Sequence, residues 1–279
     1  MSLRIPQVER AYTASRYGQL HYRIARPIGA STRPTLVCFH QSPKSGWDYE
    51  PIMAGLAQDR IVLAPDTPGY GGSDAPPAPT TIEDYARIMM EFVDGLQVAG
   101  TIPVGPIDVF GYHTGSVICT QLGRAFPDRV RRLTLLGLAA YDTEERARRL
   151  AVIDRFPVPQ ADGSNIVALW ALVESLNDPR IDVEWRQLSF AECLRSGSRL
   201  PWGFMAVYAY DFLGNLAQLT QPTLILCPED DLWDNTRAVV PIIPNGRLLE
   251  FPGVAHGFFK LDGEQVVGEL RGFLNEDLA

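Results

Sequence analysis

The most constraining feature of this sequence is an apolar run that leads directly into two glycines four residues apart. Ile107-Asp108-Val109-Phe110 has the length and character of a buried strand. It is followed by Gly111-Tyr112-His113-Thr114-Gly115 and then by helical spacing over residues 116–126. Glycine at both flanking positions indicates a turn in which a side chain would collide with neighbouring backbone. We therefore predict a strand, a tight turn that exposes His113, and a helix whose amino end points at that residue.

Strand-like and helix-like segments alternate along most of the chain. A pair of extended runs over residues 8–25, with a turn at Tyr17-Gly18, predicts an opening hairpin. This alternation is typical of the α/β class, with a mostly parallel central sheet and helices on both faces. Later strands are predicted at residues 35–39, 60–64, 107–110, 130–136, 223–227 and 247–251, and helices at 49–57, 81–96, 116–126 and 264–274.

The alternation stops over residues 141–216, where helix-like segments rich in large apolar side chains occur instead. We interpret this stretch as a helical cap inserted into a core made of residues 1–140 and 217–279. The cap aromatics that we consider candidates for lining an apolar binding pocket are Trp170, Trp202 and Tyr208.

Composition excludes several classes of function. The chain has 279 residues, of which 46% are hydrophobic, and a net charge of -8, which disfavours nucleic acid and anionic membranes as partners. The four cysteines form no CxxC pair, so the sequence indicates neither a zinc site nor a redox motif of that type. The opening residues lack a signal-peptide pattern and no apolar run is long enough for a membrane span, so we expect a cytoplasmic protein. The expected partner is a small-molecule substrate, and a homodimer is left open.

Four further segments, in order, resemble motifs of the α/β-hydrolase superfamily, in the branch with a helical cap. His40-Gln41-Ser42-Pro43 is similar to the strand-end His-Gly motif, and residues 65–73 are similar to the D-x-x-G-x-G-x-S loop. Residues 226–231 resemble the strand end that supplies the triad acid, with Asp231 at the matching position. Residues 251–257 resemble the loop that supplies the triad histidine, with His256 as that residue. The resemblance covers residues 18–274, and residues 111–115 then match the nucleophile elbow.

The resemblance implies a role for each matching residue. His256 would be a general base that the carboxylate of Asp231 holds in one tautomer. The backbone N–H groups of Gln41 and Thr114 would form an oxyanion hole. His40 would mainly stabilise the oxyanion loop and is a further candidate for lining the pocket.

Two positions depart from the family pattern. His113 stands where members usually have serine, less often aspartate or cysteine, and Ser116 falls in the following helix, where it would point away from the apex. Without an elbow aspartate, epoxide opening and dehalogenation lose their alkylated-carboxylate intermediate. Gln41 replaces the usual glycine, so its N–H remains usable while its side chain occupies or lines the pocket.

Three interpretations of His113 remain open. It is a nucleophile that forms an acyl-imidazole, or an acid/base partner of His256 that never bonds to substrate, or part of a site that has lost activity. Two adjacent imidazoles disfavour double protonation, so we expect one histidine pKa to fall.

Two histidines and a carboxylate also form a set that non-haem metals use. In triad geometry, however, the carboxylate lies behind the histidine ring and not beside its free nitrogen, so we predict no metal and no other cofactor. Our leading hypothesis is a hydrolase that acts on a small, largely apolar ester, lactone or related carbonyl compound. The alternatives are a catalytically inactive ligand-binding protein and a cofactor-free lyase or oxygenase that works by proton abstraction.

Overall fold

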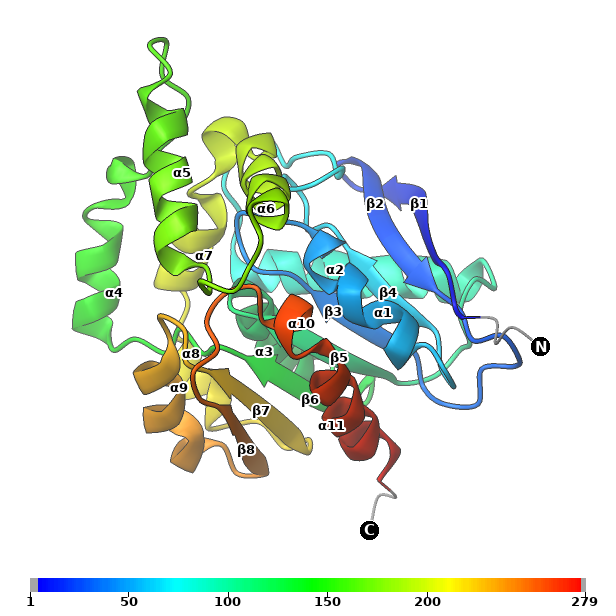
Figure 1. Cartoon of the computed structure of the whole chain (residues 1–279). Helices are drawn as coiled ribbons and strands as arrows, with labels where there is room; N and C mark the ends of the chain where they lie inside the picture. Colours follow the sequence, from blue (N-terminus) through cyan, green and yellow to red (C-terminus); the bar gives the residue numbers. More distant parts are fainter. Residues whose placement is uncertain (1–4, 277–279) are drawn as a thin grey trace.

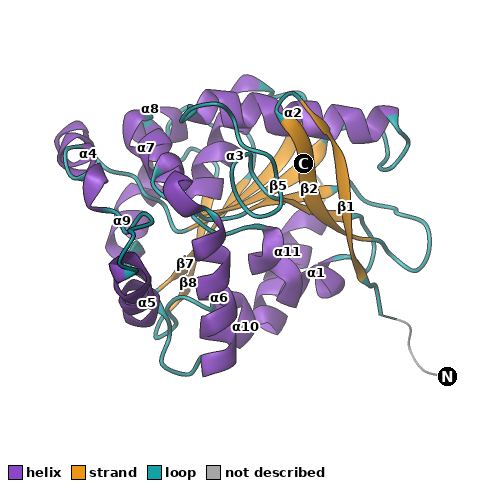
Figure 2. Ribbon diagram, turned by 90° about the horizontal axis from the view of Figure 1, so that it is seen from above, coloured by secondary structure: helices purple, strands orange, loops and turns teal. Residues whose placement is uncertain are grey.

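The structure is a computed structural model that describes residues 5–276 and places its eight strands in one sheet (Figures 1 and 2). The outermost residues of the predicted core, 1–4 and 277–279, lie outside the described part. The spatial order of the strands is β1-β2-β4-β3-β5-β6-β7-β8. Their bounds are Val8–Ser15 (β1), Gly18–Ala25 (β2), Leu36–Phe39 (β3), Val62–Pro65 (β4), Ile107–Tyr112 (β5), Val130–Leu136 (β6), Thr223–Pro228 (β7) and Gly246–Phe251 (β8).

The sheet is mostly parallel, as the sequence predicts. β1 and β2 form the opening hairpin, and β2 also runs antiparallel to β4. The other neighbouring strands are parallel, so β3 and β5 to β8 all end at one edge of the sheet. The loops that follow these strands therefore meet there, which is where open α/β sheets bind ligands.

Helices cover both faces of the sheet and enclose two apolar cores (Figure 2). On one face, α1 (Glu50–Leu56) packs against α11 (Gly263–Asn275), beside α10 (Phe258–Leu261). On the other, α2 (Ile82–Val98) packs against α3 (Thr114–Ala125). Thr81 caps α2 by accepting a hydrogen bond from the Asp84 N–H. The predicted α/β-hydrolase architecture is thus confirmed.

Between β6 and β7 the chain forms five α-helices, of which the first four lie beyond the edge of the sheet in Figure 1 and the fifth packs against α3. A small apolar cluster of Leu169, Val173, Cys193 and Leu200 holds part of this segment together. A further helix, α9 (Trp233–Val239), follows β7. No helix within residues 5–276 combines the length and apolar character needed to cross a membrane. The five helices are α4 (Thr143–Leu150), α5 (Ser164–Leu176), α6 (Val183–Arg195), α7 (Trp202–Ala209) and α8 (Phe212–Leu216).

Candidate active site

His113 occupies the apex of a strained turn between β5 and α3. Its φ of 47° and ψ of -107° make it the one non-glycine residue with positive φ among residues 5–276. A Cβ at Gly111 would overlap the backbone of Gly115, and a Cβ at Gly115 would overlap the carbonyl of Phe39, so both glycines are required sterically. The hydroxyl of buried Ser116 bonds backbone of β5 and β6 and is turned away from the apex, as predicted. The turn therefore presents His113, and no serine, to the carboxyl edge of the sheet.

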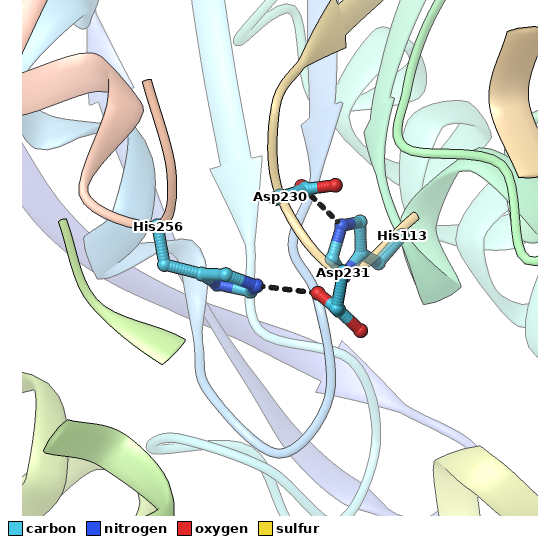
Figure 3. Close-up of side chains that lie close together, drawn as sticks. All are labelled: His113, Asp230, Asp231 and His256. Carbon is cyan, nitrogen blue, oxygen red and sulfur yellow. Dashed lines mark hydrogen bonds and ion pairs between the residues drawn. The ribbon is translucent and has the colours of Figure 1, made fainter. Parts of the chain in front are cut away.

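Two histidines and two aspartates converge at this edge (Figure 3). The Nε2 atom of His113 lies 2.9 Å from Oδ2 of Asp230, which follows β7. The Nε2 atom of His256, from the loop after β8, lies 2.8 Å from Oδ1 of Asp231. The two imidazole rings meet edge to face, with their centroids 5.2 Å apart. Each histidine is thus paired with its own carboxylate instead of with the other histidine.

The predicted position of Asp231 behind the His256 ring is wrong. Its carboxylate lies at Nε2, the nitrogen farthest from the backbone, which a triad histidine would turn toward the nucleophile. The prediction of no metal depends on carboxylates that lie away from this nitrogen. That assumption does not hold for either histidine, since His113 also meets its carboxylate through Nε2.

Surrounding groups fix the four side chains to different degrees. The Asp230 side chain is 1% exposed, and its second oxygen, Oδ1, accepts a hydrogen bond of 2.9 Å from the Leu232 N–H. The Asp231 side chain is 48% exposed, whereas that of His256 is 8% exposed. The cap supports the His256 loop, because Asp178 accepts from the Ala255 N–H while the Asp178 N–H donates to the His256 carbonyl. The half-exposed Asp231 is therefore the freest of the four side chains.

The carboxylates change the protonation of the site. Burial lowers the pKa of His113, but the charge and hydrogen bond of Asp230 outweigh burial, so the pKa lies above its ordinary value. Burial raises the pKa of Asp231, but its hydrogen bond to His256 and the nearby imidazoles hold it well below the usual range. A fall in one histidine pKa is expected only when the two imidazoles act on each other without other charges. At His113 the structure gives the opposite direction, because an aspartate accompanies each ring.

The predicted oxyanion donors border this cluster. Gln41 is buried, and its side chain lines the cavity described below, as expected. Thr114 is the first residue of α3, where a backbone N–H has no partner within the helix. Within residues 5–276, neither the Gln41 N–H nor the Thr114 N–H donates to another protein group. Both amides are thus available to a substrate oxygen, which leaves the oxyanion hole a prediction.

Two small cavities open onto the cluster. One, of about 110 Å³, extends between α5, α6 and the His40-Gln41-Ser42-Pro43 segment, and reaches His113, Asp231 and His256. The other, of about 80 Å³, lies beside His113 under α4 and α7. A larger hollow of about 730 Å³ between α1 and α11 contains none of the four cluster residues, so we place the site at the smaller cavities. Their size suits a small substrate.

Of the predicted pocket residues, one lines a cavity and the others do not. Tyr208 lines the smaller cavity. His40 lines neither cavity: it is buried, its Nδ1 donates to the Gln41 carbonyl, and its Nε2 accepts from the Thr67 N–H, so it supports the loop. Trp170 packs edge to face on Phe190 and, like Trp202, lines neither cavity.

Sequence analysis missed three polar residues of the site. Asp230 was overlooked although it directly precedes Asp231 at the end of β7, and a second acid beside a second histidine was the available signal. Lys44 is buried in the wall of the cavity of about 110 Å³, and its Nζ atom lies 3.6 Å from Oδ1 of Asp48. Arg149 borders the smaller cavity and stacks on the Tyr141 ring, 4.0 Å from its centroid. No sequence motif indicates that Lys44 and Arg149 lie at the site.

Comparisons with known proteins agree with this architecture. A family model described as alpha/beta hydrolase fold matches residues 34–158. The chain is 24% identical over 236 residues to a poly(3-hydroxyalkanoate) depolymerase of Ectopseudomonas oleovorans, covering 81% of this chain and 79% of the relative. It is 32% identical over 120 residues to the (E)-2-((N-methylformamido)methylene)succinate hydrolase of Acinetobacter baylyi, which covers 43% of each chain.

Solved structures show the same fold over nearly the whole chain. An enol-lactonase from Burkholderia xenovorans superposes with a TM-score of 0.75 at 21% identity, covering 95% of this chain and 100% of the other. An esterase from Exiguobacterium antarcticum superposes with a TM-score of 0.78 at 16% identity, covering 95% and 99%. The chain therefore has the α/β-hydrolase fold, and the relatives to which it is similar are hydrolases.

Proposed function

We propose that this enzyme hydrolyses small, largely apolar esters or lactones by direct attack of water, without a covalent intermediate. One observation carries the proposal. His113 stands at the apex where a nucleophile belongs, but its outermost nitrogen, Nε2, is engaged by Asp230. That nitrogen is the one that could reach a substrate carbonyl, and it does not offer a free lone pair while it donates to a carboxylate. Water in the adjacent cavity is then the available attacking group.

The surrounding groups support each part of this reaction. The water oxygen attacks the carbonyl carbon while its proton passes to the cluster of imidazoles and carboxylates. The N–H groups of Gln41 and Thr114 stabilise the negative charge that develops on the carbonyl oxygen. The carbon–oxygen bond of the ester then breaks, and the leaving oxygen takes up the proton that the cluster holds.

The lining of the cavity of about 110 Å³ beside the cluster supports the choice of substrate. Apolar side chains from the cap dominate it, and Lys44 and the cluster supply most of its charge. Because its volume is about 110 Å³, it fits short acyl chains or small lactone rings better than long ones. We therefore expect activity to fall as the acyl chain of a test ester is lengthened. The apolar side chains come from Phe156, Leu169, Leu172, Val173, Leu176, Leu200 and Phe204.

The test is hydrolysis of p-nitrophenyl acetate and of a small lactone by wild type, His113→Ala, Asp230→Asn and His256→Ala. We expect loss of activity in all three variants, no burst of product in the first turnover, and no acetyl adduct in the mass of the acid-quenched enzyme. A fluorophosphonate, which labels activated serines, should leave wild-type activity unchanged. Asp234→Asn, an exposed carboxylate change close to the site in sequence, is the matched control.

Two results would contradict the proposal in different ways. A stoichiometric burst with an acetyl group on His113 would show that the histidine is the nucleophile. Absence of turnover on every short ester and lactone would exclude this substrate class.

A further inference from the structure

The cluster of His113, His256, Asp230 and Asp231 has the composition of a metal site. Each residue offers one nitrogen or oxygen donor atom, and these four atoms all lie within 4.8 Å of one another. Imidazole and carboxylate together suit first-row divalent ions, of which Zn²⁺ commonly takes four such ligands. We propose that these four side chains bind one divalent transition-metal ion of this type.

The distances between donor atoms are close to those that one ion requires. Donor atoms about 2.1 Å from a shared ion lie roughly 3 to 4 Å from one another. The His113–Asp230 and His256–Asp231 pairs, at 2.9 and 2.8 Å, must open slightly, and the widest separations, up to 4.8 Å, must shorten. Both changes are small rotations of side chains, and Asp231, which is half exposed, has the freedom to make the larger one.

The charges of the cluster also match a divalent ion. Two carboxylates and two neutral imidazoles carry a total charge of -2. A hydrogen bond between each Nε2 atom and its carboxylate requires a hydrogen at the position where an ion would bind. Binding would require each Nε2 atom to give up this hydrogen, and a divalent ion with two carboxylates and two neutral imidazoles would form a neutral site.

The backbone around the cluster orients the ligands in advance. The strained turn fixes His113, and the Leu232 N–H holds the second oxygen of Asp230, so that Oδ2 faces the imidazole. Asp178 of the cap accepts from the Ala255 N–H and donates its own N–H to the His256 carbonyl. Contacts of this kind around the ligands are typical of metal sites, where they set ligand orientation.

A metal here would deepen the proposed function, and its catalytic role rests on that function. The four side chains would hold the ion, and an ion that keeps a water in a fifth, open position would lower the pKa of that water toward about 7 and so supply an attacking group without a serine. The binding of the ion itself does not depend on ester hydrolysis, so the two proposals can be tested separately.

The experiment measures metal binding directly on the full chain, with any affinity tag removed. Protein stripped with a chelator is titrated calorimetrically with Zn²⁺ and, in parallel, with Co²⁺, whose visible absorption reports its coordination. We expect one ion per chain, and a loss of affinity of at least about 100-fold in Asp230→Asn and in Asp231→Asn. Asp234→Asn should bind as wild type does. Thermal unfolding without metal shows whether each variant is folded, and the exposed Asp231 provides a variant with little risk to folding.

Each outcome decides one proposal. Absence of Zn²⁺ and Co²⁺ binding, or binding that neither aspartate change weakens, overturns the metal site. Ester hydrolysis that persists in chelator-stripped protein supports the hydrolase proposal and removes the metal from catalysis. Tight binding of one ion without any ester or lactone hydrolysis supports the metal site and overturns the proposed function.

Discussion

Gly137, the first residue after β6, lies so close to His113 that a methyl group there must displace the imidazole. A Cβ built on Gly137 overlaps Cδ2 and Nε2 of the ring, and the φ of Gly137 is 63°, in the left-handed region. Gly137→Ala therefore carries two costs, one from its backbone conformation and one from the collision. Because Nε2 is the atom that Asp230 contacts, the collision also breaks the His113–Asp230 pair.

The two costs can be separated with a second glycine. Gly100 has a φ of 68° but no heavy atom within 4 Å of its Cβ position, so Gly100→Ala carries the conformational cost alone, about 1–2 kcal/mol. Crowding a packed site adds about 1–3 kcal/mol. We expect Gly137→Ala to lower the free energy of unfolding by about 2–5 kcal/mol, and Gly100→Ala by about 1–2 kcal/mol.

The assay is urea unfolding followed by circular dichroism, together with the double variant His113→Ala/Gly137→Ala. When the imidazole is absent, the cost of Gly137→Ala should fall to that of Gly100→Ala. Esterase activity should be lost in Gly137→Ala and kept in Gly100→Ala. Equal costs for the two glycine changes, or an undiminished cost in the double variant, would refute the contact between Gly137 and the ring.

Three further predictions concern other parts of the molecule. Asp108 is fully buried and accepts hydrogen bonds from two arginines, so Asp108→Ala should lower the free energy of unfolding in urea by about 3–5 kcal/mol, because Arg131 loses the carboxylate that it pairs with and Arg60 keeps only Asp59. The Arg180 side chain holds the pKa of Asp178 well below its ordinary value, so this pairing stabilises the fold above about pH 3.9 and the stabilisation is lost as the pH falls further. In thermal unfolding at decreasing pH, Asp178→Asn should therefore lose less stability than wild type. An equal loss in the two proteins would contradict the pairing. All four cysteines are buried, and burial raises the pKa of Cys193 to about 11, so none should react with a disulfide reagent at pH 8 until the protein unfolds.

The elbow could be predicted from sequence because its cause is local. A side chain at Gly111 or Gly115 would overlap backbone close to His113, so only glycine fits at these two positions. The spacing of the two glycines in the sequence therefore indicates the turn. The strand pattern was also predictable, since parallel buried strands read as short apolar runs. The motif order then indicated which loops meet at the carboxyl edge of the sheet.

The pairing within the cluster could not be predicted in this way. His113 and Asp230 are 117 residues apart, and which of two consecutive aspartates faces which histidine depends on how the chain turns after β7. The Leu232 N–H selects the buried orientation of Asp230 and leaves Asp231 half exposed. Similarly, Trp170 and Trp202 have the composition of pocket residues, but the packing of the cap, which no local pattern reports, turns them away from both cavities.

The backbone link between the cap and the His256 loop also has an evolutionary consequence. Asn177 forms a parallel bridge with His256, and Asp178 bonds the Ala255 N–H and the His256 carbonyl. The segment between α5 and α6 is therefore hydrogen-bonded to the loop that carries His256. Insertions or deletions that reshape substrate access through this segment shift His256 as well. We therefore expect access and chemistry to change together, and a cap segment grafted from a relative to need its own matching loop.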